Sequence, residues 1–386
     1  MIDGRVQKGG LALVMSGGGA RAAYQAGLLA RVAEAFPQLF VPILTGVSAG
    51  AINAIKMVTT SGAFRDKAGA LERVWSELSV EKVFCVDASR LFGRVLGWAM
   101  SLLSGGHHPG IVPRGMVDTT PLQHFLEGEL GARDRELPAI ASSLATGAHS
   151  AVAITATSYA TGRSITWVQR AAGMELDSWD HAHRIGTAGR ITLPHVMASS
   201  ALPVIFPAVQ VGEAWFGDGG IRLTAPLAPA IHLGAERIMA ISTRYGRSRA
   251  EAARPSVIGY PPMAQVAGVL LNAIFLDLLD GDALRLERIN DLVSRIPEVR
   301  RDGLRKVDLL VLRPSQDLGK LANDYEAQLP RTFRFLTRGL GTRHTRSNDL
   351  LSLVMFQPDY LRRLLDLGRK DAETRLDDIA AFLEGA

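Results

Sequence analysis

The sequence predicts an α/β fold built on a mainly parallel sheet. Short apolar runs alternate along the chain with longer segments of helical composition, which is the pattern of parallel strands joined by crossover helices. Glycine clusters stand where several of the apolar runs end, as strand-to-helix turns require. With 386 residues, 47% of them hydrophobic, the chain can bury a sizeable core.

The first two strand and helix pairs contain the most informative turns. Residues 11–15 are an apolar run, and 20–36 have apolar side chains at helical spacing, so a glycine-rich turn joins this strand to its helix. A second run, 41–45, is followed by Ser48 and then by 51–55, which again has helical composition. Strand, serine and helix thus follow one another as in a nucleophile elbow.

The rest of the chain divides into strands and a helical C-terminal part. Further strands are predicted at 151–156, 165–169, 204–211, 237–242 and 307–312. Helices are predicted at 266–290 and over 324–384, with breaks near 339–341 and at Pro358. We expect a catalytic core over 8–245 and a mainly helical region over 246–386, packed on that core and including the strand at 307–312.

Composition limits the location and the partners. Cys85 is the only cysteine, so the chain has no internal disulfide and too few thiols for a zinc or iron–sulfur site, which favours a reducing cytoplasm. The apolar stretch at 11–15 is too short for a signal peptide, and glycine, histidine or proline interrupts the uncharged stretches 95–113 and 255–276, so we predict no membrane span. The net charge of +5 weakly favours peripheral contact with an anionic membrane surface and is poor support for nucleic acid.

The segment Gly46-Val47-Ser48-Ala49-Gly50 is a candidate nucleophile turn. Gly46 and Gly50 remove side chains that would clash in a sharp turn between strand and helix. Ser48 would lie at a helix N-terminus, whose partial positive charge favours an alkoxide. A Gly-x-Ser-x-Gly match also arises by chance in a glycine-rich chain, so this motif needs support from others.

Two further glycine motifs supply that support. Gly17, Gly18 and Gly19 stand at the start of a helix, where free N–H groups can bind an oxyanion or a phosphate. The nucleotide alternative is weak because the Gly-Lys-Ser/Thr ending of a P-loop is missing and Ala22 occupies the last glycine position of the dinucleotide fingerprint. A tight turn without chemistry is the plainer alternative.

Asp218 is the candidate base. It precedes Gly219 and Gly220 at the end of an extended apolar segment, although Asp-Gly is also a common hairpin turn. None of the nine histidines has the context of a catalytic triad. A buried carboxylate whose pKa is raised toward neutrality could take the serine proton directly, which predicts a dyad of Ser48 and Asp218.

Together, Gly17-Gly18-Gly19-Ala20-Arg21, Gly46-Val47-Ser48-Ala49-Gly50 and Asp218-Gly219-Gly220 resemble the patatin-like phospholipase family. Fainter similarity at 198–207, at Pro226, at 272–290 and at 350–371 extends the resemblance over most of the chain.

The resemblance implies a three-layer α/β/α core with additional C-terminal helices, and hydrolysis of acyl lipid esters without a metal or other cofactor. It implies that Ser48 is the nucleophile, Asp218 the base, and Gly17, Gly18 and Gly19 the oxyanion donors. Arg21 matches a basic residue beside the glycines, which would steady the loop or face an anionic headgroup.

Two departures from the family pattern leave the reacting groups intact. Val47 replaces a more familiar threonine, and Ala22 replaces a common glycine, so a need for positive φ at residue 22 would disturb the oxyanion geometry.

Other functions stay open at this stage. Residues 91–103 form an apolar stretch that is either an ordinary packed helix, the more common case, or a lid that touches the membrane. The same dyad could transfer an acyl group to an alcohol other than water. A lipid-binding or regulatory protein that keeps the fold without catalysis is the rival from another class.

Overall fold

The computed structural model describes residues 10–85, 115–174, 179–253, 259–275, 277–301, 303–329, 334 and 347–384. The predicted stretch at 91–103 lies outside these residues.

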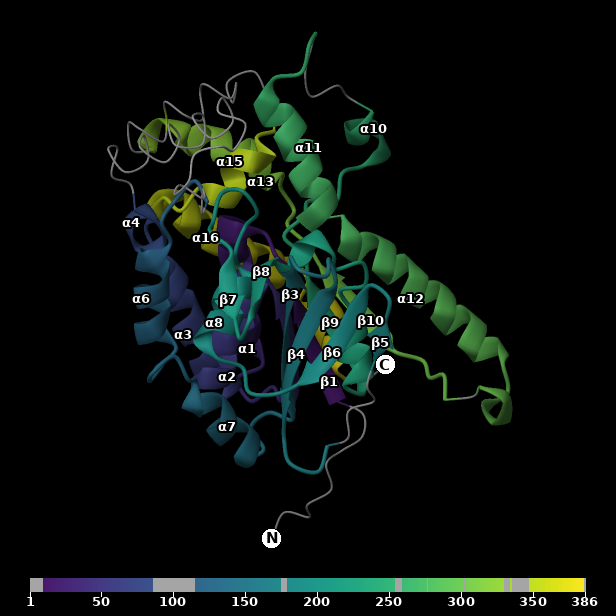
Figure 1. Ribbon diagram of the computed structural model, residues 1–386. Coiled ribbons are helices and arrows are strands. Elements are labelled where there is room, and N and C mark those ends of the chain that lie inside the picture. The colour runs from purple at the N-terminus through teal and green to yellow at the C-terminus, as the bar shows by residue number, and fades with distance from the viewer. Residues whose placement is uncertain are drawn as a thin grey trace.

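The described part of the chain is built on one central sheet with the strand order β10-β9-β1-β2-β3-β4-β6-β5 (Figure 1). The strands are β1 Gly10–Met15, β2 Ile43–Val47, β3 Ala151–Ser158, β4 Ser164–Arg170, β5 Asp180–His181, β6 Arg184–Ala188, β7 Val209–Val211, β8 Ala214–Asp218, β9 Ala235–Ile241 and β10 Asp308–Leu312. From β10 through β3 all neighbours are parallel, whereas β4 and β8 run antiparallel to β3. The sheet is therefore mixed and mostly parallel, as predicted.

Helices surround this sheet. They are α1 Ala23–Ala35, α2 Ala49–Thr59, α3 Phe64–Ser76, α4 Val80–Val83, α6 Thr120–Glu129, α7 Pro138–Ala145, α8 Leu193–Ser199, α9 Ala228–His232, α10 Arg249–Ala252, α11 Met263–Phe275, α12 Leu278–Arg295, α13 Leu318–Ala322, α15 Asp349–Val354, α16 Pro358–Thr374 and α17 Leu376–Glu384. Short 3₁₀ turns occupy Gly19–Ala22, Gly219–Ile221, Glu298–Arg300 and Asn323–Gln328.

Burial of β1 on both faces explains the three layers. Leu11, Leu13 and Met15 point into the larger core, which they share with side chains of α1, α2 and α16. The alternate residues Ala12 and Val14 point into a second core, shared with α9 and α12. A strand that is apolar on both faces needs a helical layer on each side, so the predicted α/β/α arrangement is confirmed.

The C-terminal region contributes directly to the sheet and its core. β10 pairs with β9 at the sheet edge. Helix α16 packs closely on α1, where a Cβ on Gly27 would lie 2.0 Å from the Leu365 carbonyl oxygen and one on Gly368 would lie 2.2 Å from that of Tyr24. Side chains at these two glycines would push the helices apart.

Three elements differ from their sequence predictions. The helix predicted over 324–384 begins as a 3₁₀ turn, Asn323–Gln328. Only Val209–Val211 of the segment 204–211 is a strand, because Pro203 and Pro207 lack N–H groups for a ladder and Val204 has a φ of 69°. The predicted helix at 266–290 is two helices, α11, which ends at Phe275, and α12, which begins at Leu278.

The order of β2, β3 and β8 has a direct consequence for the motifs. Val47 at the end of β2 pairs with Thr155 of β3. Asp218 at the end of β8 pairs with the next residue, Ala156. Strands β2 and β8 thus end at consecutive positions of β3, which brings the residue after Val47 next to Asp218.

Candidate active site

Ser48 lies on a strained turn between β2 and α2. Its φ of 57° and ψ of −133° are rare for a residue with a side chain. A Cβ on Gly46 would lie 2.3 Å from the Gly50 carbonyl oxygen, and one on Gly50 would lie 2.2 Å from that of Met15. Close backbone packing therefore requires both flanking glycines, and the turn presents the Ser48 side chain at the N-terminus of α2.

Asp218 is fully buried, with 0% of its surface exposed. Its Oδ1 accepts a hydrogen bond of 2.8 Å from the Gly220 N–H, and its carbonyl accepts one of 2.9 Å from the Thr157 hydroxyl. A Cβ on Gly219 would lie 2.1 Å from a backbone oxygen of β3. The turn after Asp218 is a 3₁₀ turn packed on β3 and not the hairpin that Asp-Gly can also form.

The environment of Asp218 moves its pKa toward neutrality. Burial raises the pKa from 3.8 to about 7, while the Ser48 hydroxyl and the Gly220 N–H oppose the shift. The Asp218 Oδ2 has no hydrogen-bond partner of normal geometry among the described residues. A buried carboxylate close to a serine hydroxyl, with one oxygen free to accept a proton, suits the role of a general base.

The glycine-rich turn lies against Ser48. A Cβ on Gly17 would approach the Ser48 Cβ to 2.9 Å. Gly18 and Gly19 have φ values of 147° and 53°, which only glycine adopts readily. None of the N–H groups of these three glycines donates to another described residue. Free donors beside a candidate nucleophile suit an oxyanion hole.

Arg21 is a structural residue of this turn. Only 3% of it is exposed, its Nη2 lies 2.7 Å from Asp349 Oδ1, and its Nε donates to the Ser352 hydroxyl at 2.7 Å. The opposite oxygen of Asp349 accepts from Asn272 at 2.6 Å. Of the two roles expected for Arg21, these contacts fit the one that steadies the loop and not the one that faces a headgroup, because its charge is buried and paired with Asp349 of α15.

Ala22 causes no strain in the turn. It has φ −68° and ψ −11°, an ordinary helical conformation. The family's glycine is therefore not needed here for positive φ.

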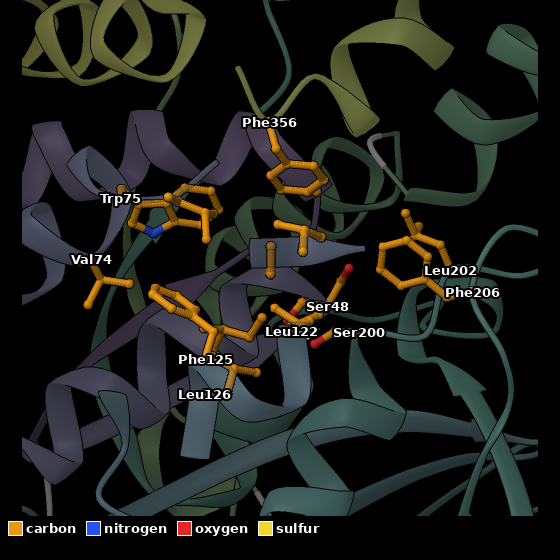
Figure 2. A pocket seen from close by; sticks show the side chains of 15 residues that line it. Ser48, Val74, Trp75, Leu122, Phe125, Leu126, Ser200, Leu202, Phe206 and Phe356 are labelled. Atoms are coloured by element: carbon orange, nitrogen blue, oxygen red, sulfur yellow. Dashed lines mark hydrogen bonds between the residues drawn. The ribbon is translucent and has the colours of Figure 1, made fainter. Parts of the chain in front are cut away.

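An apolar pocket opens at Ser48 (Figure 2). Its space measures about 510 Å³ with the solvent at its open mouth, of which about 40 Å³ admits a water-sized sphere, so the pocket is narrow. Among the described residues, only Ser48 and Ser200 contribute side-chain oxygens to its lining. The walls include Trp75, Leu122, Phe125, Leu126, Phe206 and Phe356. Such a pocket suits a hydrocarbon chain and excludes a charged substrate portion.

Two serines at the C-terminal end of α8, its last residue Ser199 and its C-cap Ser200, support the elbow and were given no role in the sequence analysis. The Ser48 N–H donates to the Ser199 hydroxyl at 3.1 Å, and that hydroxyl donates to the Thr155 carbonyl at 2.6 Å. The Ser200 hydroxyl donates to the Ser48 carbonyl at 3.3 Å. Only their sequence position in a segment similar to the family, ahead of Asp218, could have signalled a role.

A buried amide network, also missed from the sequence, links the glycine-rich turn to the pocket wall. Gln25 Nε2 donates to the Ser16 carbonyl at 2.9 Å, and its Oε1 accepts from Asn53 at 2.9 Å. Asn53 Oδ1 accepts from the Trp75 indole at 2.7 Å. The network fixes α1, α2 and α3 around the site.

Among the described residues, no histidine lines the pocket, and His149 and His195 bond to Lys67 and Thr192. Within the same residues, no three His, Cys, Asp or Glu side chains form a group that could hold a metal ion.

Solved structures with a related fold are distant. The human GIVD cytosolic phospholipase A2 has a TM-score of 0.49 and 11% identity, covering 100% of this chain and 64% of its own. VipD from Legionella pneumophila has a TM-score of 0.33 and 14% identity, covering 95% of this chain and 72% of its own. ExoU from Pseudomonas aeruginosa, solved with SpcU, has a TM-score of 0.20 and 24% identity, covering 43% of this chain and 36% of its own. A search of curated proteins gave no significant match.

The family model for patatin-like phospholipases matches residues 13–231, more than half of the chain. This match includes the glycine-rich turn, the elbow of Ser48 and the turn of Asp218, which the fold brings to one end of the sheet. The chain belongs to the patatin-like phospholipase family.

Proposed function

We propose that this protein is a serine acyl hydrolase that cleaves a carboxylic ester of a lipid through an acyl-Ser48 intermediate. The observation that carries the proposal is the end-to-end position of β2 and β8 on β3, which puts the Ser48 turn beside a buried carboxylate. Family membership supports lipid hydrolysis in general terms. The dyad and the substrate class are our proposal.

In the first step, Ser48 Oγ attacks the ester carbonyl while its proton passes to Asp218 Oδ2. With a pKa of about 7, Asp218 is ionised in an appreciable fraction of molecules at neutral pH and still basic enough to accept a proton. The N–H groups of Gly17, Gly18 and Gly19 would stabilise the negative oxygen.

The acyl-enzyme then forms as the ester C–O bond breaks. Asp218 returns its proton to the departing alcohol oxygen, and the acyl chain stays in the apolar pocket. Water next attacks the acyl carbonyl, gives its proton to Asp218, and the acyl–Oγ bond breaks with return of that proton to Ser48. An alcohol in place of this water would give acyl transfer, which product analysis distinguishes.

The direct test is turnover of a short-chain p-nitrophenyl ester by Ser48→Ala and Asp218→Asn. Both should lose activity by at least about a thousandfold and remain folded. The controls are Ser76→Ala, an exposed serine, and Asp282→Asn, whose pKa is also raised by burial but which lies outside the pocket. Retained turnover in Ser48→Ala or Asp218→Asn would refute the dyad.

Labelling by a fluorophosphonate separates catalysis from mere lipid binding. An activated Ser48 should react covalently, and Ser48→Ala should not be labelled. A protein that only binds lipid would leave the probe unreacted. The acyl length, the headgroup and the position of the cleaved ester require analysis of lipid products, and the cytoplasmic location stays a prediction.

A further inference from the structure

Helix α11 exposes a face without any charge. Residues 259–275 contain no Asp, Glu, Lys or Arg. The exposed fractions are 66% for Met263, 41% for Val266, 56% for Val269 and 59% for Leu270. Their spacing puts them on one side of the helix. Grouped, exposed apolar side chains of this kind mark an interaction surface.

The opposite face of α11 is fixed beside the candidate site. Asn272 donates to Asp349, the partner of Arg21. Phe275 is buried against the Asp218 turn, where a Cβ on Gly220 would lie 2.3 Å from its ring. Helix α11 also lies at the same end of the molecule as α15, which contacts the glycine-rich turn (Figure 1). A surface that contacts the exposed face of α11 therefore lies close to the candidate active site.

Helix α12 continues the surface with a different chemistry. Three arginines, one aspartate and two apolar residues line a shallow groove along its outer side: Arg285, Arg288, Arg295, Asp291, Ile289 and Leu292. None of the three arginines forms an ion pair with a described residue, although Arg285 donates to the Thr224 carbonyl at 3.5 Å and its charge acts on Asp282. In Figure 1 the far end of α12 projects away from the sheet. Although α12 also has four acidic residues, its outer face carries three arginines against one aspartate, and a face with this excess of arginine beside apolar side chains suits an anionic membrane.

Length and composition alone would also admit a membrane span at Met263–Arg295, which has a mean hydropathy of 1.5 in its most apolar window, with 24% of that window buried. The stretch includes one residue outside the described set. Its middle is tied to the protein: Arg244 lies 3.0 Å from Asp277 and 2.8 Å from Asp280, and Leu279 is buried in the second core. These contacts favour a helix pair that lies along a surface.

We propose that the exposed faces of α11 and α12 dock the protein on an anionic phospholipid bilayer. We call them the α11–α12 surface, defined by Met263, Val266, Val269, Leu270, Arg285, Arg288 and Arg295. The apolar side chains of α11 enter the acyl boundary, and the α12 arginines bind lipid phosphates. The inference rests on the proposed function in one respect, since a lipid ester in a bilayer must reach the pocket at Ser48.

Co-sedimentation of the full chain with vesicles tests this surface. Ser48→Ala protein avoids vesicle hydrolysis and should bind mixed phosphatidylcholine and phosphatidylglycerol vesicles more tightly than phosphatidylcholine alone. Arg285→Gln/Arg288→Gln/Arg295→Gln should reduce partitioning onto the mixed vesicles by about 100-fold, because each arginine near the surface contributes about a factor of five. Val269→Ser/Leu270→Ser should reduce binding to both kinds of vesicle.

The matched control is Arg65→Gln/Arg73→Gln/Arg363→Gln, which removes the same charge from exposed arginines of α3 and α16. It should bind as the parent does. Equal loss in the control would overturn the proposal, as would a parent protein that does not bind the mixed vesicles. A dimer that disappears in Val269→Ser/Leu270→Ser, without vesicle binding, would assign the face to a second copy instead.

Catalysis is measured separately, on versions with Ser48 intact and a soluble ester. The surface variants should keep their melting temperature, ester turnover and fluorophosphonate labelling. Vesicle binding without turnover would refute the proposed function and leave the docking surface standing. Turnover without vesicle binding would refute the docking surface and leave the proposed function standing.

Discussion

The Ser48 N–H donates a hydrogen bond of 3.1 Å to the Ser199 hydroxyl. That hydroxyl donates a hydrogen bond of 2.6 Å to the Thr155 carbonyl, so Ser199 at the end of α8 connects the strained elbow to β3. Ser48 has a positive φ that a relaxed chain would leave. We infer that Ser199 helps to hold the elbow in place.

Ser199→Ala should therefore lower kcat on a short-chain ester by roughly 10- to 100-fold, because a misplaced nucleophile loses alignment with the ester. It should also cost about 1–3 kcal/mol in the free energy of unfolding, since the Ser48 N–H would be buried without an acceptor. Ser199→Thr keeps a hydroxyl and should recover much of both. Native kcat in Ser199→Ala would contradict this role.

The activity should rise with pH through about 7, because Asp218 accepts the serine proton only when it is ionised and burial raises its pKa to about 7. The measurement is kcat/KM for a p-nitrophenyl ester across the pH range, read at the isosbestic wavelength of the product. An ascending limb near the ordinary carboxyl pKa of about 4 would show that another group, or an unshifted Asp218, acts as the base.

Asp218 should also make the protein less stable as pH rises. Its pKa of about 7 in the folded protein lies above the unfolded value of 3.8, so between these pH values the folded protein binds more protons than the unfolded chain. The free energy of unfolding therefore falls as the pH rises from 3.8 to about 7. Asp218→Asn removes the buried charge and can still accept from the Gly220 N–H. We expect its gain in the free energy of unfolding to be on the order of 4 kcal/mol larger above pH 7 than below pH 4, as an upper estimate.

Denaturant unfolding of both proteins at either end of this pH range provides the measurement. Asp366→Asn, which removes an exposed carboxylate of α16, controls for general effects of removing a carboxylate. A stability difference between wild type and Asp218→Asn that does not change with pH would contradict the raised pKa.

The ion pair of Arg21 and Asp349 should hold the glycine-rich turn in place. Side-chain exposures of 3% and 12% make it largely buried. Asp349→Ala leaves the Arg21 charge without its partner and should cost about 3–5 kcal/mol in unfolding free energy. Arg21→Met/Asp349→Leu, which removes both charges, should cost less. If the single and double variants have the same stability, the pair is not what stabilises the turn.

The pocket should determine which acyl-chain lengths the protein accepts. In Figure 2, Val74 lies at the side of the pocket remote from Ser48. Val74→Phe should fill that side, so kcat/KM should fall for long-chain esters and stay near the wild-type value for short ones. The larger side chain should lower the free energy of unfolding by about 1–3 kcal/mol, which thermal unfolding checks. An equal fall for all chain lengths would show that the pocket does not hold the chain.

Local patterns in the sequence were sufficient for the fold class and the first elements. The apolar run ending at Met15 and the Ser48 turn obey local rules of strand, turn and helix, which depend on neighbours in the chain. The strand prediction for 204–211 was mostly wrong, because its apolar residues favour a strand while Pro203 and Pro207 lack the N–H groups that a strand needs. The assigned roles of Ser48 and Asp218 stay predictions until the variants are measured.

What the sequence by itself determined was which residue types stand at which turns: glycines that permit close backbone approach, a serine after a strand and an aspartate before two glycines. Only the tertiary structure decided their relations in space. Pairing of both β2 and β8 with β3 brings Ser48 to Asp218, and burial raises the pKa of that carboxyl. Packing of α15 on the glycine-rich turn places Asp349 where it forms a buried ion pair with Arg21. Distances, burial and pairing between remote segments arise from how the whole chain packs, so no local pattern contains them.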